Sequence, residues 1–233
     1  MRKPFLHLLL IAIILGCTER VPDDTVTRIL AVGDSLLATN SLAGKSVPAV
    51  VEQELREPVV DRTVSGASML YALPISGSAG LSIPKQYREN EWEWVIMNGG
   101  GNDLWLGCGC FACDRKLDKL ISKNGLKGAI PGMMNRLRKS GAQVVYVGYM
   151  RSPGLGSPIE HCRDEGNELE RRVQILASLD RGIHFLSLQD LVPEGDRSFH
   201  GLDMIHPSVK ASTAIGQRVA ELIRAQSELS GKP

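Results

Sequence analysis

The sequence lacks any apolar run long enough to cross a membrane as a helix. Its longest apolar stretch runs from Phe5 to Leu15 and is interrupted by His7, whereas a spanning helix needs about 20 such residues. Long basic runs are also missing, and 27 Lys and Arg side chains nearly balance 26 Asp and Glu side chains. This balance indicates no basic patch of the kind that binds nucleic acid. We therefore expect neither a multi-span membrane protein nor a nucleic-acid-binding protein.

Internal repeats and low-complexity segments are absent as well, which argues against solenoids and disordered linkers. Hydrophobic residues make up 43% of the chain and charged residues 23%, close to the usual mixture of a globular protein. The 233 residues fit a single domain of ordinary size. We expect this domain to span residues 28–233.

The N-terminus has the pattern of an export signal that ends in a cysteine. Basic residues at Arg2 and Lys3 precede the apolar stretch, which is too short to span a membrane but suits a secretory signal. The run ends in Leu15-Gly16-Cys17, which resembles the lipobox of bacterial lipoproteins. The resemblance implies a signal peptide over residues 1–16 and a lipid-modified Cys17 at the start of a tether over residues 17–27.

A lipid-modified protein of this kind would be anchored in the bacterial cell envelope without crossing a membrane. Because Thr18 rather than an aspartate follows the cysteine, the resemblance favours the outer membrane, with the domain facing the periplasm. The alternative is an ordinary cleaved signal, in which Cys17 has no role.

From residue 28 onward, short apolar runs alternate with longer amphipathic stretches. Continuous apolar runs are typical of strands buried on both faces, and their alternation with helices indicates right-handed crossovers. The sequence therefore predicts a three-layer α/β/α sandwich with a mostly parallel five-stranded sheet. The expected strands are ILAVG ending at Gly33, residues 59–64 and 94–99, and runs that begin at residues 144 and 183. The expected amphipathic stretches are 47–57, 117–141, 165–180 and 208–226.

Ser35 stands just after the first expected strand, in the segment Gly33-Asp34-Ser35-Leu36. In open α/β sheets, reacting groups gather outside the carboxyl ends of the strands. Backbone N–H groups at the start of the following helix can receive a developing oxyanion. Asp and Ser are also common as plain turn and capping residues, so this segment alone leaves both interpretations open.

Two further segments contain side chains suited to acyl chemistry. Asn102 follows three glycines after the third expected strand, and its side-chain amide is a neutral donor for an oxyanion. Near the C-terminus, Asp203 precedes His206 by three residues. This spacing lets the carboxylate accept from one ring nitrogen, so that the other nitrogen can take a serine proton.

Together these segments resemble the GDSL or SGNH hydrolase family, whose motif residues Ser, Gly, Asn and His occur in that order. Ser35, Gly66, Asn102 and His206 match the four positions, and the resemblance spans roughly residues 28–225. It implies a flavodoxin-like SGNH hydrolase fold. The segment Gly33-Asp34-Ser35-Leu36-Leu37 lacks the second glycine of the G-x-S-x-G elbow found in α/β-hydrolases. This difference disfavours the α/β-hydrolase fold.

The resemblance also implies roles for these residues. Ser35 would be the nucleophile, His206 the general base and then acid, and Asp203 the residue that orients His206. The oxyanion hole would consist of the Ser35 and Gly66 amides and the Asn102 side chain. The implied reaction is serine-dependent hydrolysis of a carboxylic ester through an acyl-enzyme, with no metal or organic cofactor.

The family cleaves lipids, thioesters, short acyl esters and acetylated sugars, and no residue of the sequence selects among these substrates. An envelope location favours a lipid, short acyl or O-acetyl ester, so the partner would be a small-molecule or glycan ester. Two alternatives from other classes stay open. The domain could bind acylated glycans or lipids without catalysis, or it could transfer the acyl group to a hydroxyl acceptor.

Four cysteines remain after Cys17, three of them in one loop. In an exported protein an even number of cysteines favours disulfides, and four cysteines allow three pairings. We expect two bridges. The cysteine cluster would tie the loop after Asn102 to the loop after Met150 and shape the substrate mouth. The alternative is a zinc site that includes His161. The cysteines are Cys108, Cys110, Cys113 and Cys162.

Two aromatic residues follow the ends of expected strands. Trp105 and Tyr149 either line an acyl or sugar pocket or fill the core. Sequence alone does not separate the two.

Overall fold

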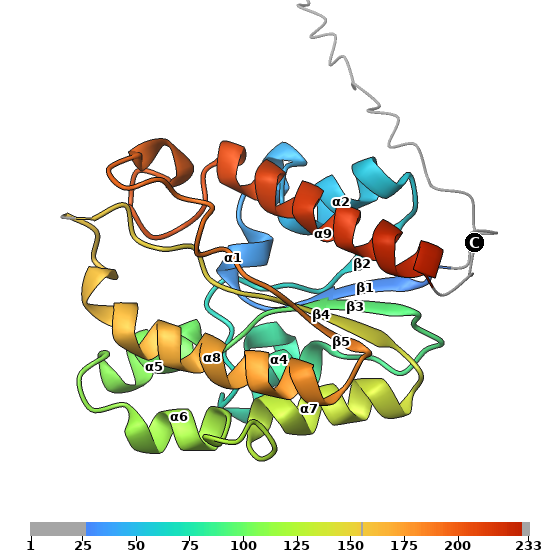
Figure 1. The fold of residues 1–233 in the computed structure, drawn as a ribbon, viewed down its shortest axis with the longest axis horizontal. Coiled ribbons are helices and arrows are strands. Elements are labelled where there is room, and N and C mark those ends of the chain that lie inside the picture. The colour runs from blue at the N-terminus through green and yellow to red at the C-terminus, as the bar shows by residue number, and fades with distance from the viewer. Residues whose placement is uncertain (1–26, 155, 230–233) are drawn as a thin grey trace, which may run out of the picture.

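The computed structural model describes residues 27–154 and 156–229. The predicted signal peptide, Cys17 and the tether up to residue 26 lie outside the described residues. Within the described part, five strands and nine helices form three layers, with the sheet in the middle (Figure 1). The strands are β1 (Ile29–Val32), β2 (Val59–Asp61), β3 (Trp94–Met97), β4 (Gln143–Val147) and β5 (Ile183–Leu186). The helices are α1 (Ser35–Ala38), α2 (Val47–Leu55), α3 (Pro74–Ser76), α4 (Ile83–Gln86), α5 (Gly101–Cys108), α6 (Asp114–Leu120), α7 (Ala129–Lys139), α8 (Arg163–Leu179) and α9 (Val209–Leu229).

The sheet is parallel throughout, in the strand order β2-β1-β3-β4-β5. Ile29 of β1 pairs with Val59 on one side and with Trp94 on the other. The predicted three-layer fold and five-stranded sheet are thus confirmed. The chain continues from β1 to β2 on one side of β1 and later to β3 on its other side. This reversal of direction opens a crevice between the carboxyl ends of β1 and β3.

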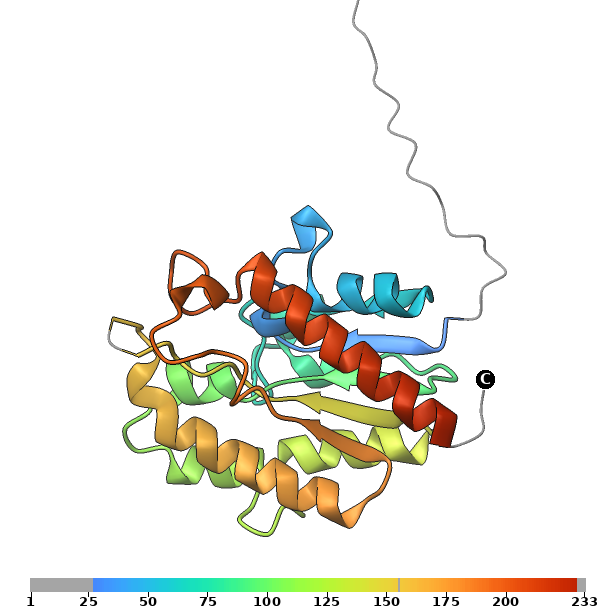
Figure 2. The same ribbon diagram turned by 45° about the horizontal axis from the view of Figure 1, so that its top comes forward.

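Alternating side chains of the central strands form two separate hydrophobic cores. On β1, Ile29 and Ala31 face α1, α2 and α9, whereas Leu30 and Val32 face the layer of α4 to α8. All four side chains are fully buried, which explains why the strands read as continuous apolar runs. Figure 2 shows α9 lying beside α2 on one face of the sheet and α8 beside α7 on the other.

The expected amphipathic stretch 117–141 contains parts of two helices. It is divided between α6 and α7, with residues 121–128 as the connection. Gly128 precedes α7 at φ 123°, and a β-carbon there would lie 2.5 Å from the carbonyl oxygen of Leu120. Only glycine fits this conformation and this close approach, so the helical stretch breaks there.

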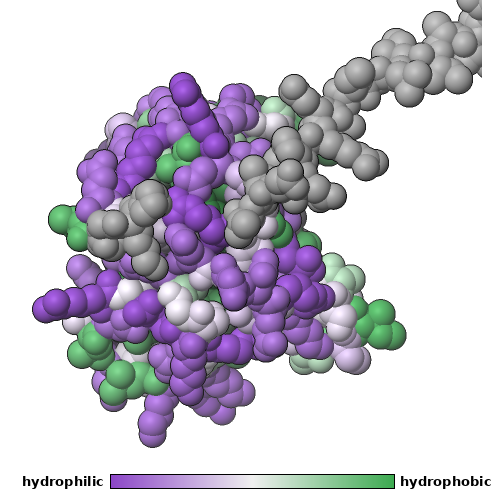
Figure 3. All heavy atoms as spheres, turned by 90° about the vertical axis from the view of Figure 1, so that its right-hand side faces the viewer, coloured by the Kyte–Doolittle hydropathy of each residue, from purple (hydrophilic) through white to green (hydrophobic). Residues whose placement is uncertain are grey.

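The face formed by the amino ends of the strands is mainly hydrophilic where the view shows it (Figure 3). Ser35 and Asn102 lie at the opposite edge, because each follows the carboxyl end of its strand. None of the helices in residues 27–154 and 156–229 has the length and apolar character needed to cross a membrane.

Candidate active site

The segment between β1 and α1 places Ser35 at the first position of a short helix. Asp34 caps this helix, since its side chain accepts a 3.0 Å hydrogen bond from the Leu36 amide. The cap leaves the amide of Ser35 without a protein acceptor among the described residues. A free amide at this place is suited to receive an oxyanion.

The Asp34 carboxylate is buried and holds three loops together. Asn98 Nδ2 donates to its Oδ1 at 2.7 Å, and the Asp34 amide donates back to Asn98 Oδ1 at 2.9 Å. The Tyr149 hydroxyl donates to Oδ2 at 2.6 Å. Burial raises the pKa of Asp34, although these hydrogen bonds oppose the rise. The loops after β1, β3 and β4 are therefore joined directly behind Ser35.

Asp203 orients the imidazole of His206. Nδ1 of His206 lies 2.6 Å from Asp203 Oδ2, while Oδ1 accepts 3.0 Å bonds from the amides of Ile205 and His206. Partial burial disfavours the charged carboxylate, but these hydrogen bonds outweigh it and lower the pKa of Asp203 to about 2. With Nδ1 engaged by a carboxylate, Nε2 is the ring nitrogen left to exchange a proton.

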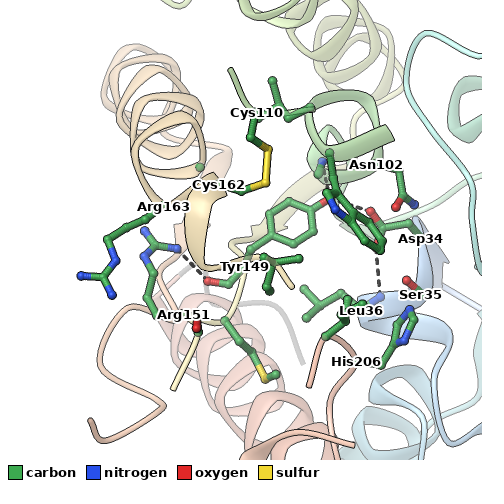
Figure 4. A pocket seen from close by; sticks show the side chains of 18 of the residues that line it. Asp34, Ser35, Leu36, Asn102, Cys110, Tyr149, Arg151, Cys162, Arg163 and His206 are labelled. Atoms are coloured by element: carbon green, nitrogen blue, oxygen red, sulfur yellow. Dashed lines mark hydrogen bonds between the residues drawn. A yellow bond between two sulfur atoms is a disulfide. The ribbon is translucent and has the colours of Figure 1, made fainter. Parts of the chain in front are cut away.

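Ser35 and His206 line one cavity of about 130 Å³ (Figure 4). Among the described residues, no hydrogen bond joins the side chains of Ser35 and His206. Such a gap is common in unliganded active sites, because catalytic hydrogen bonds often tighten only when substrate binds. The fold thus brings the predicted nucleophile and base, 171 positions apart in sequence (206 − 35), to a single opening.

The Asn102 side chain lines the same cavity at the start of α5. One of its two amide hydrogens is engaged, since Nδ2 donates to the Ala67 carbonyl at 2.9 Å. The second remains for a ligand. Gly66 lies outside the cavity lining, two residues after Val64, whose amide donates to the Gly33 carbonyl at 3.0 Å. Gly66 is therefore held beside the Ser35 loop, and its amide has no protein acceptor among the described residues.

A buried carboxylate that the sequence analysis did not single out fixes the Gly66 loop. Asp103 accepts 2.8 Å bonds from the amides of Met69 and Leu70. Burial raises the pKa of Asp103, against the effect of these two bonds. The sequence could have indicated Asp103 through its position directly after Asn102, because both residues lie in the same helical turn.

Apolar side chains form most of the remaining cavity wall. They come from α1, α5, the segment after β4, α8 and the segment before α9, and Trp105 and Tyr149 are among them. Both aromatic residues line this cavity and also pack against the hydrophobic core, so the two predicted alternatives do not exclude each other. The other apolar lining residues include Leu36, Leu104, Met150, Ile159, Leu169 and Ile205.

The four cysteines form two disulfides, as expected. Cys108 pairs with Cys113 inside one loop, and Cys110 pairs with Cys162 across 52 positions. Side-chain ligand atoms of Cys110, His161 and Cys162 lie within 4.8 Å of one another. Zinc needs cysteine as thiolate, and both of these sulfurs are bonded to each other, so the cluster does not fit the zinc alternative.

The parallel sheet, the serine after β1 and the histidine–aspartate pair near the C-terminus are the features of an SGNH hydrolase. The comparison of families agrees, since the model of the GDSL-like lipase/acylhydrolase family matches residues 31–214. The chain belongs to this family. A comparison with curated protein sequences gives no match.

Solved structures share the fold at low sequence identity. One is provisionally assigned as an SGNH hydrolase from Slackia heliotrinireducens, with a TM-score of 0.57 and 17% identity over 84% of this chain and 98% of that one. Another is provisionally assigned as an arylesterase from Agrobacterium tumefaciens, with a TM-score of 0.57 and 20% identity over 86% and 99%. A third, an active-site mutant of a family two carbohydrate esterase from Clostridium thermocellum, has a TM-score of 0.58 and 16% identity over 88% and 65%.

Proposed function

We propose that this protein hydrolyses carboxylic esters through an acyl-enzyme on Ser35. The observation that supports this most directly is the shared cavity, which Ser35 lines together with a His206 held by Asp203. A serine hydroxyl becomes a nucleophile when an oriented base can take its proton. Here the base is oriented before any substrate binds.

In the proposed reaction, Ser35 Oγ forms a bond to the ester carbonyl carbon while its proton passes to His206 Nε2. The Nδ1–H of His206 stays hydrogen-bonded to Asp203, which stabilises the imidazolium. The imidazolium then protonates the alcohol oxygen as the carbon–oxygen bond of the ester breaks. Water attacks the acyl-enzyme by the same route in reverse, which releases the acid and restores Ser35.

The oxyanion of each tetrahedral intermediate would be bound by three donors. These are the amides of Ser35 and Gly66 and the second amide hydrogen of Asn102. The first two have no protein acceptor among the described residues, and the third is the unused hydrogen beside the Ala67 contact. Donors fixed in advance need no reorganisation when the negative charge develops.

The test is turnover of p-nitrophenyl acetate and butyrate by the full-length protein and by Ser35→Ala, together with labelling by a fluorophosphonate. We expect Ser35→Ala to lose at least about 10³-fold in kcat and to lose the label. Ser41→Ala is the matched control, because Ser41 is exposed on the short 3-10 helix after α1 and lies outside the cavity lining. Turnover that survives in Ser35→Ala would contradict the proposal.

We also propose that the enzyme works in the cell envelope, anchored by lipid at Cys17. The support is the sequence pattern of residues 1–17, which lie outside the described residues. Cys17→Ala should abolish the incorporation of labelled fatty acid in growing cells. The matched control is Cys108→Ala with Cys113→Ala, which should keep the label. Labelling that persists in Cys17→Ala would exclude this anchor.

A further inference from the structure

The cavity extends from Ser35 away from the catalytic histidine. The cavity lining includes His206 with its neighbours Ile205 and Pro207, and it also includes Cys110 and Cys162. Figure 4 shows the disulfide across the cavity from Ser35 and His206, with Tyr149 between. In the proposed reaction the leaving alcohol must stay beside His206 to receive its proton. The acyl group is therefore the part of the ester that extends toward the disulfide.

The size of the cavity limits what it can hold. Its volume is about 130 Å³, and an apolar protein cavity of about 150 Å³ holds one molecule of benzene. Six carbon atoms are thus close to the capacity of this cavity. Longer acyl chains would have to displace the wall or leave through the open side.

The far wall is covalently fixed. Cys110 follows α5 and is 4% exposed, and Cys162 stands immediately before α8, so their disulfide ties these two helices together. Gly166 lies one helical turn after Cys162 and also lines the cavity. A β-carbon on Gly166 would meet nothing within 4 Å, so there is open space for a larger side chain at this position.

The two arginines on the cavity wall are each paired with a glutamate. Arg151 pairs at 2.6 Å with Glu170, whose side chain is 1% exposed, and Arg163 pairs with Glu160. The buried Asp34 carboxylate is held by Tyr149 and Asn98. A neutral acyl group therefore fits this cavity better than a charged one, because it leaves these pairs intact.

We propose, building on the proposed ester hydrolysis, that this cavity is the acyl site and that the Cys110–Cys162 disulfide and Gly166 close its far end. The enzyme is accordingly selective for neutral acyl groups of up to about six carbons. Cys108–Cys113, the other disulfide, has no part in this selection, since neither of its cysteines lines the cavity.

The first test measures kcat/KM of the full-length protein for p-nitrophenyl acetate, butyrate, hexanoate and decanoate. The leaving group is the same throughout, so differences report the acyl group. We expect a rise of about four-fold per added methylene up to hexanoate, as each becomes buried, and a fall of at least about ten-fold at decanoate.

Gly166→Leu should fill the far end without strain. We expect the ratio of kcat/KM for hexanoate to kcat/KM for acetate to fall at least about ten-fold. Gly132→Leu is the matched control, because Gly132 also lies in a helix, also has nothing within 4 Å of an added β-carbon, and is outside the cavity lining. It should leave this ratio within about two-fold of that of the parent protein.

A second pair of variants opens the wall instead of filling it. Cys110→Ala with Cys162→Ala should raise the ratio of decanoate to hexanoate turnover at least about five-fold, since it removes both sulfur atoms and the tie between the helices. Cys108→Ala with Cys113→Ala should leave this ratio unchanged. A ratio of two substrates is insensitive to the fraction of protein that is folded.

The outcomes separate the two proposals. Turnover that needs Ser35 but shows the same acyl profile in Gly166→Leu and Gly132→Leu would overturn the acyl site alone. The acyl site would also be overturned if Gly166→Leu changed kcat/KM only among acetates of different alcohols, because the cavity would then hold the leaving group. If no ester is turned over with dependence on Ser35, ester hydrolysis and this inference fail together.

Discussion

The hydroxyl of Tyr149 donates a 2.6 Å hydrogen bond to Oδ2 of Asp34, the residue directly before Ser35. The same hydroxyl accepts a 2.9 Å bond from the amide of Gly101, the first residue of α5. One side chain from the end of β4 therefore connects the loop of the candidate nucleophile with the helix of Asn102. Burial raises the pKa of Tyr149 well above its ordinary value, which keeps the hydroxyl as the donor to Asp34.

Tyr149→Phe removes this connection and keeps the ring in the cavity wall. Because a hydrogen bond to a buried charged group is lost, we expect the free energy of unfolding to fall by about 1.5–3 kcal/mol. Denaturation in urea measures it. Tyr71→Phe is the control, since the Tyr71 hydroxyl contacts Ser76 at 2.9 Å in a neutral pair outside the cavity, and its loss should be about 1 kcal/mol. Equal losses in both variants would contradict the role of Tyr149.

Gly101→Ala tests the close approach between α5 and Tyr149. A β-carbon at this position would lie 2.7 Å from the Tyr149 ring, so the ring or the helix must move. We expect a loss of about 1–3 kcal/mol in the free energy of unfolding, and a lower kcat as Asn102 shifts with the helix. Gly132→Ala, which meets nothing within 4 Å, should instead stabilise its helix by up to about 1 kcal/mol. If Gly101→Ala left the free energy of unfolding unchanged, the helix and the Tyr149 ring would be able to move apart without cost.

Asn102→Ala removes one proposed oxyanion donor. The expected result is a fall in kcat of about 10²–10³-fold with little change in KM, because the lost bond forms only in the transition state. Steady-state kinetics on p-nitrophenyl butyrate provides the measurement. Asn135→Ala, on the exposed face of α7, is expected to behave like the parent protein. A rise in KM alone would assign Asn102 to substrate binding.

The pair of Asp203 and His206 predicts how stability depends on pH. The pKa of Asp203 is lowered to about 2 in the folded protein, against about 3.9 in an unfolded chain. Its stabilising contribution is therefore complete above about pH 5 and disappears as the pH falls from 4 to 2. Because the Asp203 side chain is 47% exposed, we expect this contribution to be about 1 kcal/mol or less.

Asp203→Asn cannot ionise, so it lacks this contribution at every pH. The difference in the free energy of unfolding between the two proteins should be constant at pH 5–7 and should shrink toward pH 2. Thermal unfolding across this range checks it. A difference that does not change with pH would mean that Asp203 has an ordinary pKa in the folded protein.

Local sequence patterns determined the fold class and the candidate catalytic residues. Continuous apolar runs between amphipathic stretches predicted the parallel sheet, because a strand buried on both faces has no solvent-exposed face with polar side chains. Ser35 and Asn102 were found because each lies a few residues after such a run, and Asp203 and His206 because they are three residues apart. The number of disulfides followed from an even count of cysteines in a chain whose sequence predicts export. The break between α6 and α7 was missed, although glycines at 125 and 128 marked it.

The tertiary structure alone decided which distant residues meet. Cys110 pairs with Cys162 over 52 positions, and Tyr149 reaches Asp34 over 115. Such contacts depend on the order of the strands and on how α5 and α8 pack over the sheet, and no local periodicity encodes either. The acyl-sized cavity between these helices has the same origin. Its walls come from five separate segments, so its shape exists only once the crossovers have packed.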